Sequence, residues 1–312
     1  MTTQPLPTQP LTTQPLAGQP SADQPPATHP PADQPGRLHA LRARHAYLDG
    51  LLTPRGLTGL ALVGAIVLAG LLAPLLTSAD PLAQGPDALA APGGAHLLGT
   101  DDLGRDLLSR VLYGIRTDLV IAAAAVPVGA AAGCALAVAA TTSRAADVVV
   151  QRAFDLILAF PGLILALAVT AILGAGTAPV VIVIALAEIP GFGRMLRSGI
   201  LVQREREYAL AARVGGASRL RVLVRHVLPN SADPLVVQLA VSLSIAVFIE
   251  GGMSFLGVGV RPPAPSLGGI LSQAMPYLEQ DPAFAAVPLV AITGLVLGLT
   301  FLAESLNRGN RR

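Results

Sequence analysis

The feature that most constrains this chain is a set of long stretches without a single charged side chain. Crossing the hydrocarbon core of a bilayer takes about 20 consecutive apolar residues in a helix. Stretches of comparable length cover residues 57–76, 119–143, 156–187, 234–249 and 283–303. Charged residues make up only 13% of the 312 residues, about half of the usual fraction in soluble domains. The sequence therefore indicates a polytopic membrane protein.

The stretch 156–187 is too long for one ordinary span. It contains the turn-forming sequence Gly-Ala-Gly-Thr-Ala-Pro at 174–179, so two helices are the better interpretation. Small residues are frequent in these stretches, and they let helices approach closely in lipid. We predict an all-α bundle of six transmembrane helices, at about 57–76, 119–140, 154–173, 178–193, 234–256 and 283–303.

The amino-terminal 36 residues differ sharply from the rest. Proline recurs at five-residue intervals, mostly after glutamine, and few apolar side chains are present. Proline removes amide donors and blocks helices, and a segment with so little to bury stays disordered. We therefore predict a disordered tail at 1–36 and a membrane domain at 37–312.

The arginines give the predicted orientation. All 21 basic residues other than histidine are arginine, and 17 of them lie in cytoplasmic segments if the amino terminus is cytoplasmic. Because Lys and Arg favour cytoplasmic loops, we predict a multi-pass protein of the cell membrane with both termini in the cytoplasm. Positive charge spread over loops also argues against nucleic acid as a partner. Without lysine the chain has no Walker A lysine, so any ATP binds elsewhere.

The loop 204–230, between the fourth and fifth predicted spans, is too charged to cross a membrane. The sequence predicts a short helix at 205–214, a stop at Gly215–Gly216, and a second helix with Ser218 as its N-cap. Four apolar residues of this second helix follow helical spacing, and Pro229 is expected to end it. The four residues of this predicted apolar stripe are Leu220, Leu223, Val224 and Val227.

This loop resembles the cytoplasmic loop of inner-membrane permease subunits of ABC importers. Their pattern is Glu-Ala-Ala, three residues, Gly, nine residues, Ile, one residue, Leu-Pro. Here Ala211, Ala212, Gly216 and Leu228-Pro229 match it, while Leu210 replaces the Glu and His226 replaces the Ile.

Four other stretches narrow the resemblance to the dipeptide/oligopeptide/nickel group. They are Leu-Gly-Thr-Asp-Asp-Leu-Gly-Arg-Asp at 98–106, Arg-Ala-Phe-Asp at 152–155 followed by Phe-Pro at 160–161, Glu-Gly-Gly-Met-Ser-Phe-Leu-Gly-Val-Gly at 250–259, and Pro-Pro-Ala-Pro-Ser-Leu-Gly at 262–268. Leu267 stands where the group usually has Trp. The likeness covers roughly residues 95–305 and leaves the proline-rich tail outside.

The resemblance implies a permease for short peptides or a related small solute, with nickel or another metal chelate as the alternative cargo. Its implied partners are a second homologous permease subunit, two cytoplasmic ATPase subunits and an extracytoplasmic solute-binding protein, all within a lipid bilayer. The permease itself would bind no cofactor and catalyse no reaction. The implied ATPase contact consists of small residues at the glycine elbow: Ala211, Ala212, Gly215, Gly216, Ala217 and Ser218.

Two further groups of ionisable residues call for an explanation. Asp101, Asp102, Arg105 and Asp106 follow the first predicted span, and we expect them to cap an amphipathic helix, with Asp101 or Asp102 near its start. Docking of the binding protein, or a metal or substrate site, is the functional alternative for this cluster. Glu250 lies inside an apolar span, where an ionisable residue suggests a functional role such as gating.

Two other classes of protein remain as alternatives. An ion-coupled secondary transporter would need internal repeats, and none is evident in the sequence. An intramembrane serine hydrolase would need a base near Ser254, yet all five histidines lie outside the predicted spans. The same placement of histidines disfavours nickel, and we predict no metal site.

Overall fold

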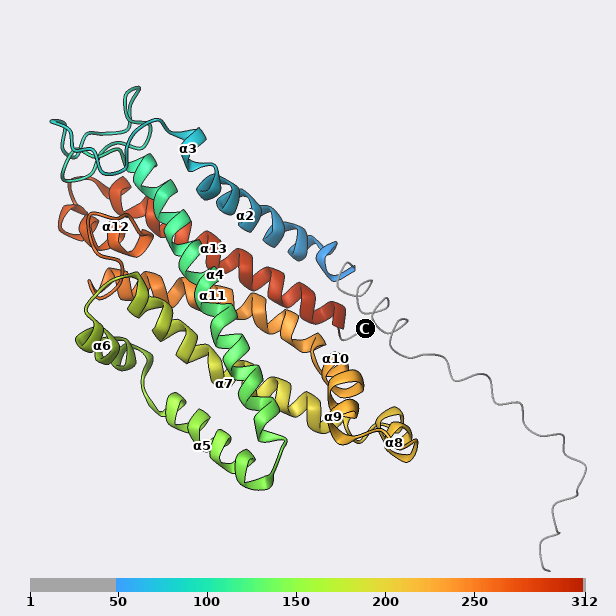
Figure 1. Cartoon of the computed structure of the whole chain (residues 1–312). Coiled ribbons are helices and arrows are strands. Elements are labelled where there is room, and N and C mark those ends of the chain that lie inside the picture. Colours follow the sequence, from blue (N-terminus) through green and yellow to red (C-terminus); the bar gives the residue numbers. More distant parts are fainter. Residues whose placement is uncertain (1–48, 311–312) are drawn as a thin grey trace, which may run out of the picture.

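The computed structural model describes residues 49–310 and is all-helical over that range, with a single isolated β-bridge between Thr100 and Asp106 (Figure 1). The predicted all-α bundle is confirmed. The predicted tail at 1–36 lies outside the described residues.

Nine helices form the bundle and its borders in the described range. They are α2 (Pro54–Leu71), α3 (Ala73–Leu76), α4 (Leu107–Ala140), α5 (Arg144–Ala159), α6 (Gly162–Leu173), α7 (Thr177–Gln203), α11 (Asp233–Phe255), α12 (Leu267–Ala274) and α13 (Pro282–Asn310). The loop between α7 and α11 contains α8 (Glu207–Val214), α9 (Arg219–Val222), a π-helical turn (Leu223–Val227) and α10 (Leu228–Ser231).

Five of these helices are long and apolar enough to cross a membrane: α2, α4, α7, α11 and α13. A sixth span is available only if α5 and α6 count as one, because the pair is bent by 91° at its junction. The sequence predicted one continuous helix at 154–173, and the structure differs there. Phe160 and Pro161 separate α5 from α6, and a proline disfavours helical backbone at the residue before it.

Helix α4 is the centre of the bundle and packs against α7, α11, α2 and α12. In Figure 1, α2 and α13 lie at one margin, and α5 and α6 lie at the opposite margin beside α7. Glycines permit the closest approaches. A methyl group at Gly133 of α4 would collide with the Ile189 carbonyl oxygen of α7, and one at Gly59 of α2 would lie 2.9 Å from the Gly298 oxygen of α13. Such backbone proximity is the usual basis of helix association in lipid.

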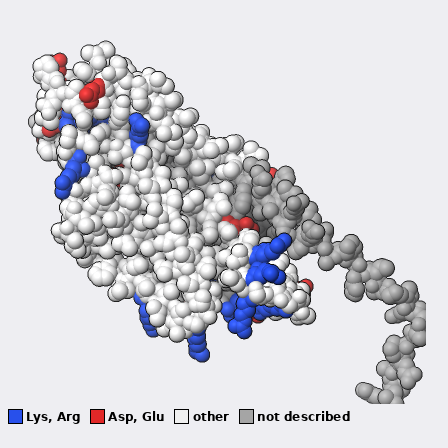
Figure 2. All heavy atoms as spheres, in the orientation of Figure 1, with Lys and Arg blue, Asp and Glu red and all other residues white. Residues whose placement is uncertain are grey.

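Most charged residues lie at the two ends of the bundle, whereas Asp118, Glu188 and Glu250 are buried within it. Figure 2 shows a broad uncharged belt on this face, with arginines and acidic residues gathered on either side of it. We call one end the cap end, formed by residues 77–106 and 256–281. The other is the elbow end, formed by α8 to α10 together with the adjoining α4–α5 turn, the start of α5 and the end of α7. The belt between them matches the hydrocarbon layer that the apolar helices require.

Two helices extend well past their predicted spans. α4 begins at Leu107 rather than near 119, and α7 continues to Gln203 rather than ending near 193. In both cases the extension contains charged residues, which a search for uncharged stretches excludes. Arg110 and Asp118 of α4 are nevertheless buried, because other helices supply hydrogen-bonding partners for them.

Candidate coupling and gating sites

The elbow between α8 and α9 has the local structure that the sequence predicts. Helix α8 ends at Val214, and Gly216 adopts a left-handed backbone with φ of +82°. This conformation is open to glycine at little cost, unlike most other residues. Ser218 caps α9, because its side-chain oxygen accepts a hydrogen bond from the Arg221 amide at 3.3 Å. The predicted stop and the predicted N-cap are therefore confirmed.

A small apolar cluster holds this elbow to the ends of α4 and α7. Ala209, Val222 and Val227 are at most 3% exposed and pack with Leu196 and Ile200 of α7. The predicted apolar stripe is wrong for two of its four residues. In the structure, Leu220 is 68% exposed and Val224 is 55% exposed. The π-helical turn adds a residue to one turn of the helix and so rotates a different set of side chains inward.

Pro229 also differs from its predicted role, because the helical path continues past it. The π-helical turn ends at Val227, and Pro229 then lies in the first turn of α10. Proline is tolerated at that position because the first amides of a helix have no partner within the helix.

Polar contacts fix the same loop to the last turn of α7. The Tyr208 hydroxyl donates to Gln203 Oε1 at 2.8 Å, and Gln203 Nε2 donates to the Asn230 carbonyl oxygen at 3.0 Å. Burial raises the pKa of the Tyr208 phenol, so its hydroxyl keeps the proton that this hydrogen bond uses. The start and the end of the loop are therefore joined through one glutamine side chain.

The outer surface of the elbow is open. Val214 is 91% exposed, and a Cβ placed on Gly216 would meet no atom within 4 Å. Of the predicted ATPase-contact residues, Ala211, Gly215, Gly216 and Ser218 are exposed and Ala212 and Ala217 are half-buried. The structure thus brings all six together on one short helix–turn–helix surface that a partner can reach.

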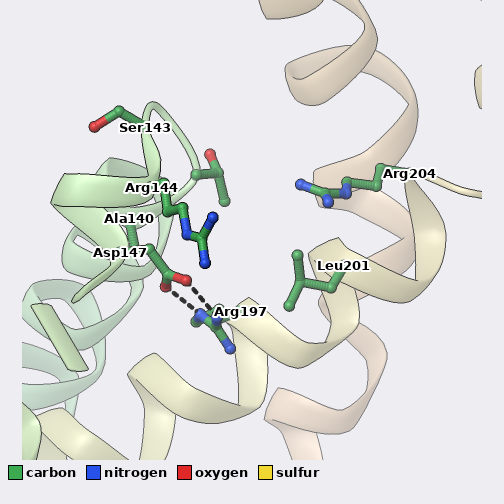
Figure 3. Close-up of a pocket in the computed structure, with 8 residues that line it drawn as sticks. Ala140, Ser143, Arg144, Asp147, Arg197, Leu201 and Arg204 are labelled. Carbon is green, nitrogen blue, oxygen red and sulfur yellow. Dashed lines mark hydrogen bonds and ion pairs between the residues drawn. The ribbon is translucent and has the colours of Figure 1, made fainter.

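A cavity of about 270 Å³ adjoins the elbow between the α4–α5 turn and the end of α7 (Figure 3). Asp147 of α5 accepts two hydrogen bonds from Arg197 of α7, at 2.5 and 2.6 Å. Arg144 and Arg204 also line this cavity. The ion pair attaches the bent helix pair α5–α6 to the central bundle, and it was not evident from the sequence.

At the cap end, the acidic cluster forms a buried network rather than an exposed one. Asp101 is fully buried, accepts a hydrogen bond from Arg105 Nε at 2.6 Å and forms an ion pair with Arg110 Nη1 at 3.0 Å. Both arginines also donate to Gln273 Oε1 of α12, at 3.2 and 3.0 Å. Loop 77–106, α4 and α12 are therefore joined by one set of charged side chains.

The predicted helix cap lies in this cluster but at a different residue. Asp106, not Asp101 or Asp102, caps α4 by accepting from the Ser109 amide at 2.7 Å. Its second oxygen contacts His96 Nδ1 at 2.9 Å. Asp101 instead turns toward the two arginines, which demand a buried counter-charge.

Glu250 is fully buried on α11, and its partner is a residue that sequence reasoning missed. The carboxyl groups of Glu250 and Asp118 of α4 lie close enough to interact with each other. Ser254 donates to Glu250 Oε1 at 2.7 Å, and the Leu267 amide donates to Asp118 Oδ2 at 3.3 Å. The sequence offered one signal, namely that Asp118 directly precedes a long uncharged stretch, but nothing linked it to Glu250.

Among the residues that the structure describes, no group of three or more His, Cys, Asp and Glu side chains could hold a metal ion. The polar groups at the two ends position helices and expose a contact surface.

Comparison with known proteins agrees with this arrangement. Residues 125–312 match the family described as binding-protein-dependent transport system inner membrane component. The chain is 38% identical over 249 residues to a putative peptide transport system permease protein of Brucella suis biovar 1, covering 80% of this chain and 84% of that protein.

Two further relatives have similar coverage. A dipeptide transport system permease protein of Alkalihalophilus pseudofirmus is 34% identical, covering 80% of this chain and 83% of that protein. A di/tripeptide transport system permease protein of Pseudomonas aeruginosa is 38% identical, covering 80% and 85%. The chain therefore belongs to the binding-protein-dependent transport system inner membrane components, the non-catalytic permease subunits of ABC importers whose ATP is bound by partner ATPase subunits.

Proposed function

We propose that this permease translocates short peptides that an extracytoplasmic binding protein delivers. The observation that carries the cargo assignment is the agreement of the three relatives, which are named for peptides, dipeptides and di/tripeptides. A nickel cargo has no comparable support, because the described residues offer no metal-binding group.

The elbow at Gly216 is the proposed contact for the ATPase. Its outer surface is exposed and built from small residues, which allow close approach of a partner. Its inner surface is packed on α7 and α4 through Ala209, Val222 and Val227. A displacement of the elbow would therefore reach the two helices at the centre of the bundle.

The proposed orientation places the elbow end and both termini in the cytoplasm, and the cap end outside. The distribution of arginines supports it, with 17 of 21 falling on the cytoplasmic side. The functional unit would be a heterodimer of this chain with a second, similar permease subunit, above two ATPases and below the binding protein.

The proposed contribution to docking of the binding protein is indirect for Asp101, Arg105 and Asp106. Their side chains are at most 9% exposed, so a binding protein would meet the cap surface that they hold in shape rather than the charges themselves. Glu250 is the proposed gating residue, since it links α11 to α4 in the half of the bundle near the cap end. Glu250→Gln is the test of gating, and unchanged transport and ATP turnover in that variant would exclude the role.

The test of the cargo is uptake into proteoliposomes that contain this chain with its partner permease, ATPases and binding protein. We expect ATP-dependent uptake of a labelled dipeptide and no uptake of Ni²⁺ above a control without ATP. Uptake of Ni²⁺ but not of peptides would contradict the assignment, and uptake by this chain alone along an ion gradient would indicate a secondary transporter.

A further inference from the structure

Two carboxyl groups meet in a closed space where α4, α11 and α12 converge. Asp118 and Glu250 are both fully buried, and their carboxyl groups lie close enough to interact. One oxygen of each has a donor, the Leu267 amide for Asp118 Oδ2 and the Ser254 hydroxyl for Glu250 Oε1. The other two oxygens, Asp118 Oδ1 and Glu250 Oε2, make no hydrogen bond to the described residues, and the Ser266 hydroxyl is a further group that interacts with Glu250.

If both carboxyl groups are ionised, no hydrogen atom is available to form a hydrogen bond between them. An ionised carboxylate is an acceptor only, so two ionised groups would face each other with lone pairs and with like charges. A single proton on either carboxyl group gives the contact its donor and provides a partner for both remaining oxygens. It also removes one of the two buried negative charges, which no cation balances here.

The surrounding backbone leaves little room for water or an ion. A methyl group at Gly268 of α12 would collide with the Gly251 carbonyl oxygen of α11, next to Glu250. A methyl group at Gly114 of α4 would lie 3.2 Å from the Leu267 amide nitrogen. The three helices therefore touch through their backbones directly beside the carboxyl pair, and hydrating the pair would require them to separate.

No other charged group reaches this site from the helices packed around it. α12 carries no charged residue, and α13 carries none before Glu304. On α7, Glu188 is bonded to Ser242, two turns along α11 from Glu250. On α4, Arg110 forms an ion pair with Asp101, and Arg116 is exposed. Arg261, after α11, reaches toward Gly174 instead.

The pair also belongs to a longer chain of hydrogen bonds. The Val260 amide donates to the Ser254 oxygen at 3.0 Å, and Ser254 donates to Glu250. At the other end the Leu267 amide donates to Asp118. The two sides of the connection between α11 and α12 are therefore joined through the two carboxyl groups.

We propose that Asp118 and Glu250 form a proton-binding site, in which one proton shared by the two carboxyl groups ties α4 to α11 and to the α11–α12 connection. The ligand of the site is the proton itself. The bound proton holds α4 and α11 together, and Asp118 and Glu250 are both positioning residues.

The direct test is infrared spectroscopy of the full chain in lipid nanodiscs near neutral pH, which reports the C=O stretch of protonated carboxyl groups. We expect a band that resists exchange with D₂O and that is lost in both Asp118→Asn and Glu250→Gln. Asp147→Asn is the control, because Asp147 is a partly exposed partner of Arg197 and should leave the band unchanged. A spectrum that neither Asp118→Asn nor Glu250→Gln alters would overturn the proposal.

Thermal unfolding gives a second measurement, and its dependence on pH distinguishes loss of the proton site from a general loss of stability. Glu250→Gln retains a donor toward Asp118, so it should unfold close to the wild-type temperature, whereas Glu250→Ala should unfold about 5 °C or more below it. Stability that depends on the proton is present at low pH and lost as the pH rises, so the wild type should weaken with rising pH while Glu250→Gln does not. If the wild type is instead stabilised by added Na⁺ or Ca²⁺, a metal cation fills the site and the proton assignment is wrong.

Discussion

Both ends of the bundle contain arginine–aspartate pairs, but the two ends bury them to different degrees. At the cap end the side chains of Asp101 and Arg105 are 0% and 4% exposed, whereas at the elbow end those of Asp147 and Arg197 are 31% and 27% exposed. A buried pair ties elements firmly, because removing one partner strands a charge away from water. A partly exposed pair can be replaced by water at little cost.

The apolar contacts of the two ends differ in the same sense. α12 at the cap end packs into the main core through Leu267 and Ile270, which are fully buried. The elbow has its own small cluster and leaves Val214 almost entirely exposed. The cap end therefore satisfies its groups internally, and the elbow end leaves apolar surface exposed. This difference is the one expected if the elbow is the proposed contact with the ATPase.

The largest effect on stability should come from Asp101→Ala. The substitution leaves Arg105 and Arg110 buried without the negative charge that they share, at an expected cost of about 3–5 kcal/mol in the free energy of unfolding. The measurement is thermal unfolding of the purified chain. Asp102→Ala is the matched control, because Asp102 is 24% exposed and lies 3.7 Å from Arg105, so its loss should cost about 0–1 kcal/mol. Equal losses in the two variants would remove the contrast between buried and exposed charges.

Gly216→Leu should affect coupling more than folding. A side chain at a φ of +82° costs about 1–2 kcal/mol, and the leucine would project from the open surface of the elbow. We expect membrane insertion to persist while peptide uptake falls by about tenfold, since about 1.4 kcal/mol of lost contact gives that factor. Uptake and ATP hydrolysis by the reconstituted transporter are the measurements.

Gly215→Ala tests whether any substitution in the elbow impairs transport, or only one that places a large side chain on its open surface. Gly215 has an ordinary φ of −71°, and a Cβ there would lie 3.4 Å from the Ala211 carbonyl oxygen. We expect its transport to stay near the wild-type rate. Unimpaired uptake by Gly216→Leu, or equal loss in both variants, would count against Gly216 as the point of coupling.

The smallest effect should come from Asp147→Asn. This variant breaks a two-bond ion pair with Arg197, as Asp101→Ala does at the cap end, but in a partly exposed setting. We expect a loss of about 0–1 kcal/mol, visible as a shift of at most about 4 °C in the unfolding temperature. A loss as large as that of Asp101→Ala would show that the elbow end is held as firmly as the cap end.

The length of the uncharged stretches predicted five membrane helices from the sequence, because burial in lipid leaves a pattern in every residue of a span, but it did not predict the 91° bend between α5 and α6. The break at Gly174–Gly176 and the stop at Gly215–Gly216 were likewise predictable, since turns depend on local residues. The cap at Ser218 belongs to the same class of local feature.

Features that depend on distant partners could not be predicted. Asp118 and Glu250 are 132 positions apart, and only the packing of α4 on α11 brings them together. Asp106 rather than Asp101 is the cap because α4 begins at Leu107, while Asp101 pairs with Arg105 and Arg110, whose burial the sequence does not reveal. The rotated face of the loop follows from a π-helical turn, which has no pattern of its own in the residues Leu223–Val227.

The most direct test of the account is the position of Val214, which is 91% exposed at the tip of α8. The single native cysteine, Cys134, is first replaced by alanine, and Val214→Cys is then introduced. In the assembled transporter we predict that a thiol-specific cross-linker joins this cysteine to the ATPase subunit, and that a membrane-impermeant maleimide added to intact cells does not label it. Labelling from outside, or efficient cross-linking to the binding protein instead, would contradict the assignment of this loop as the cytoplasmic contact through which ATP hydrolysis drives transport.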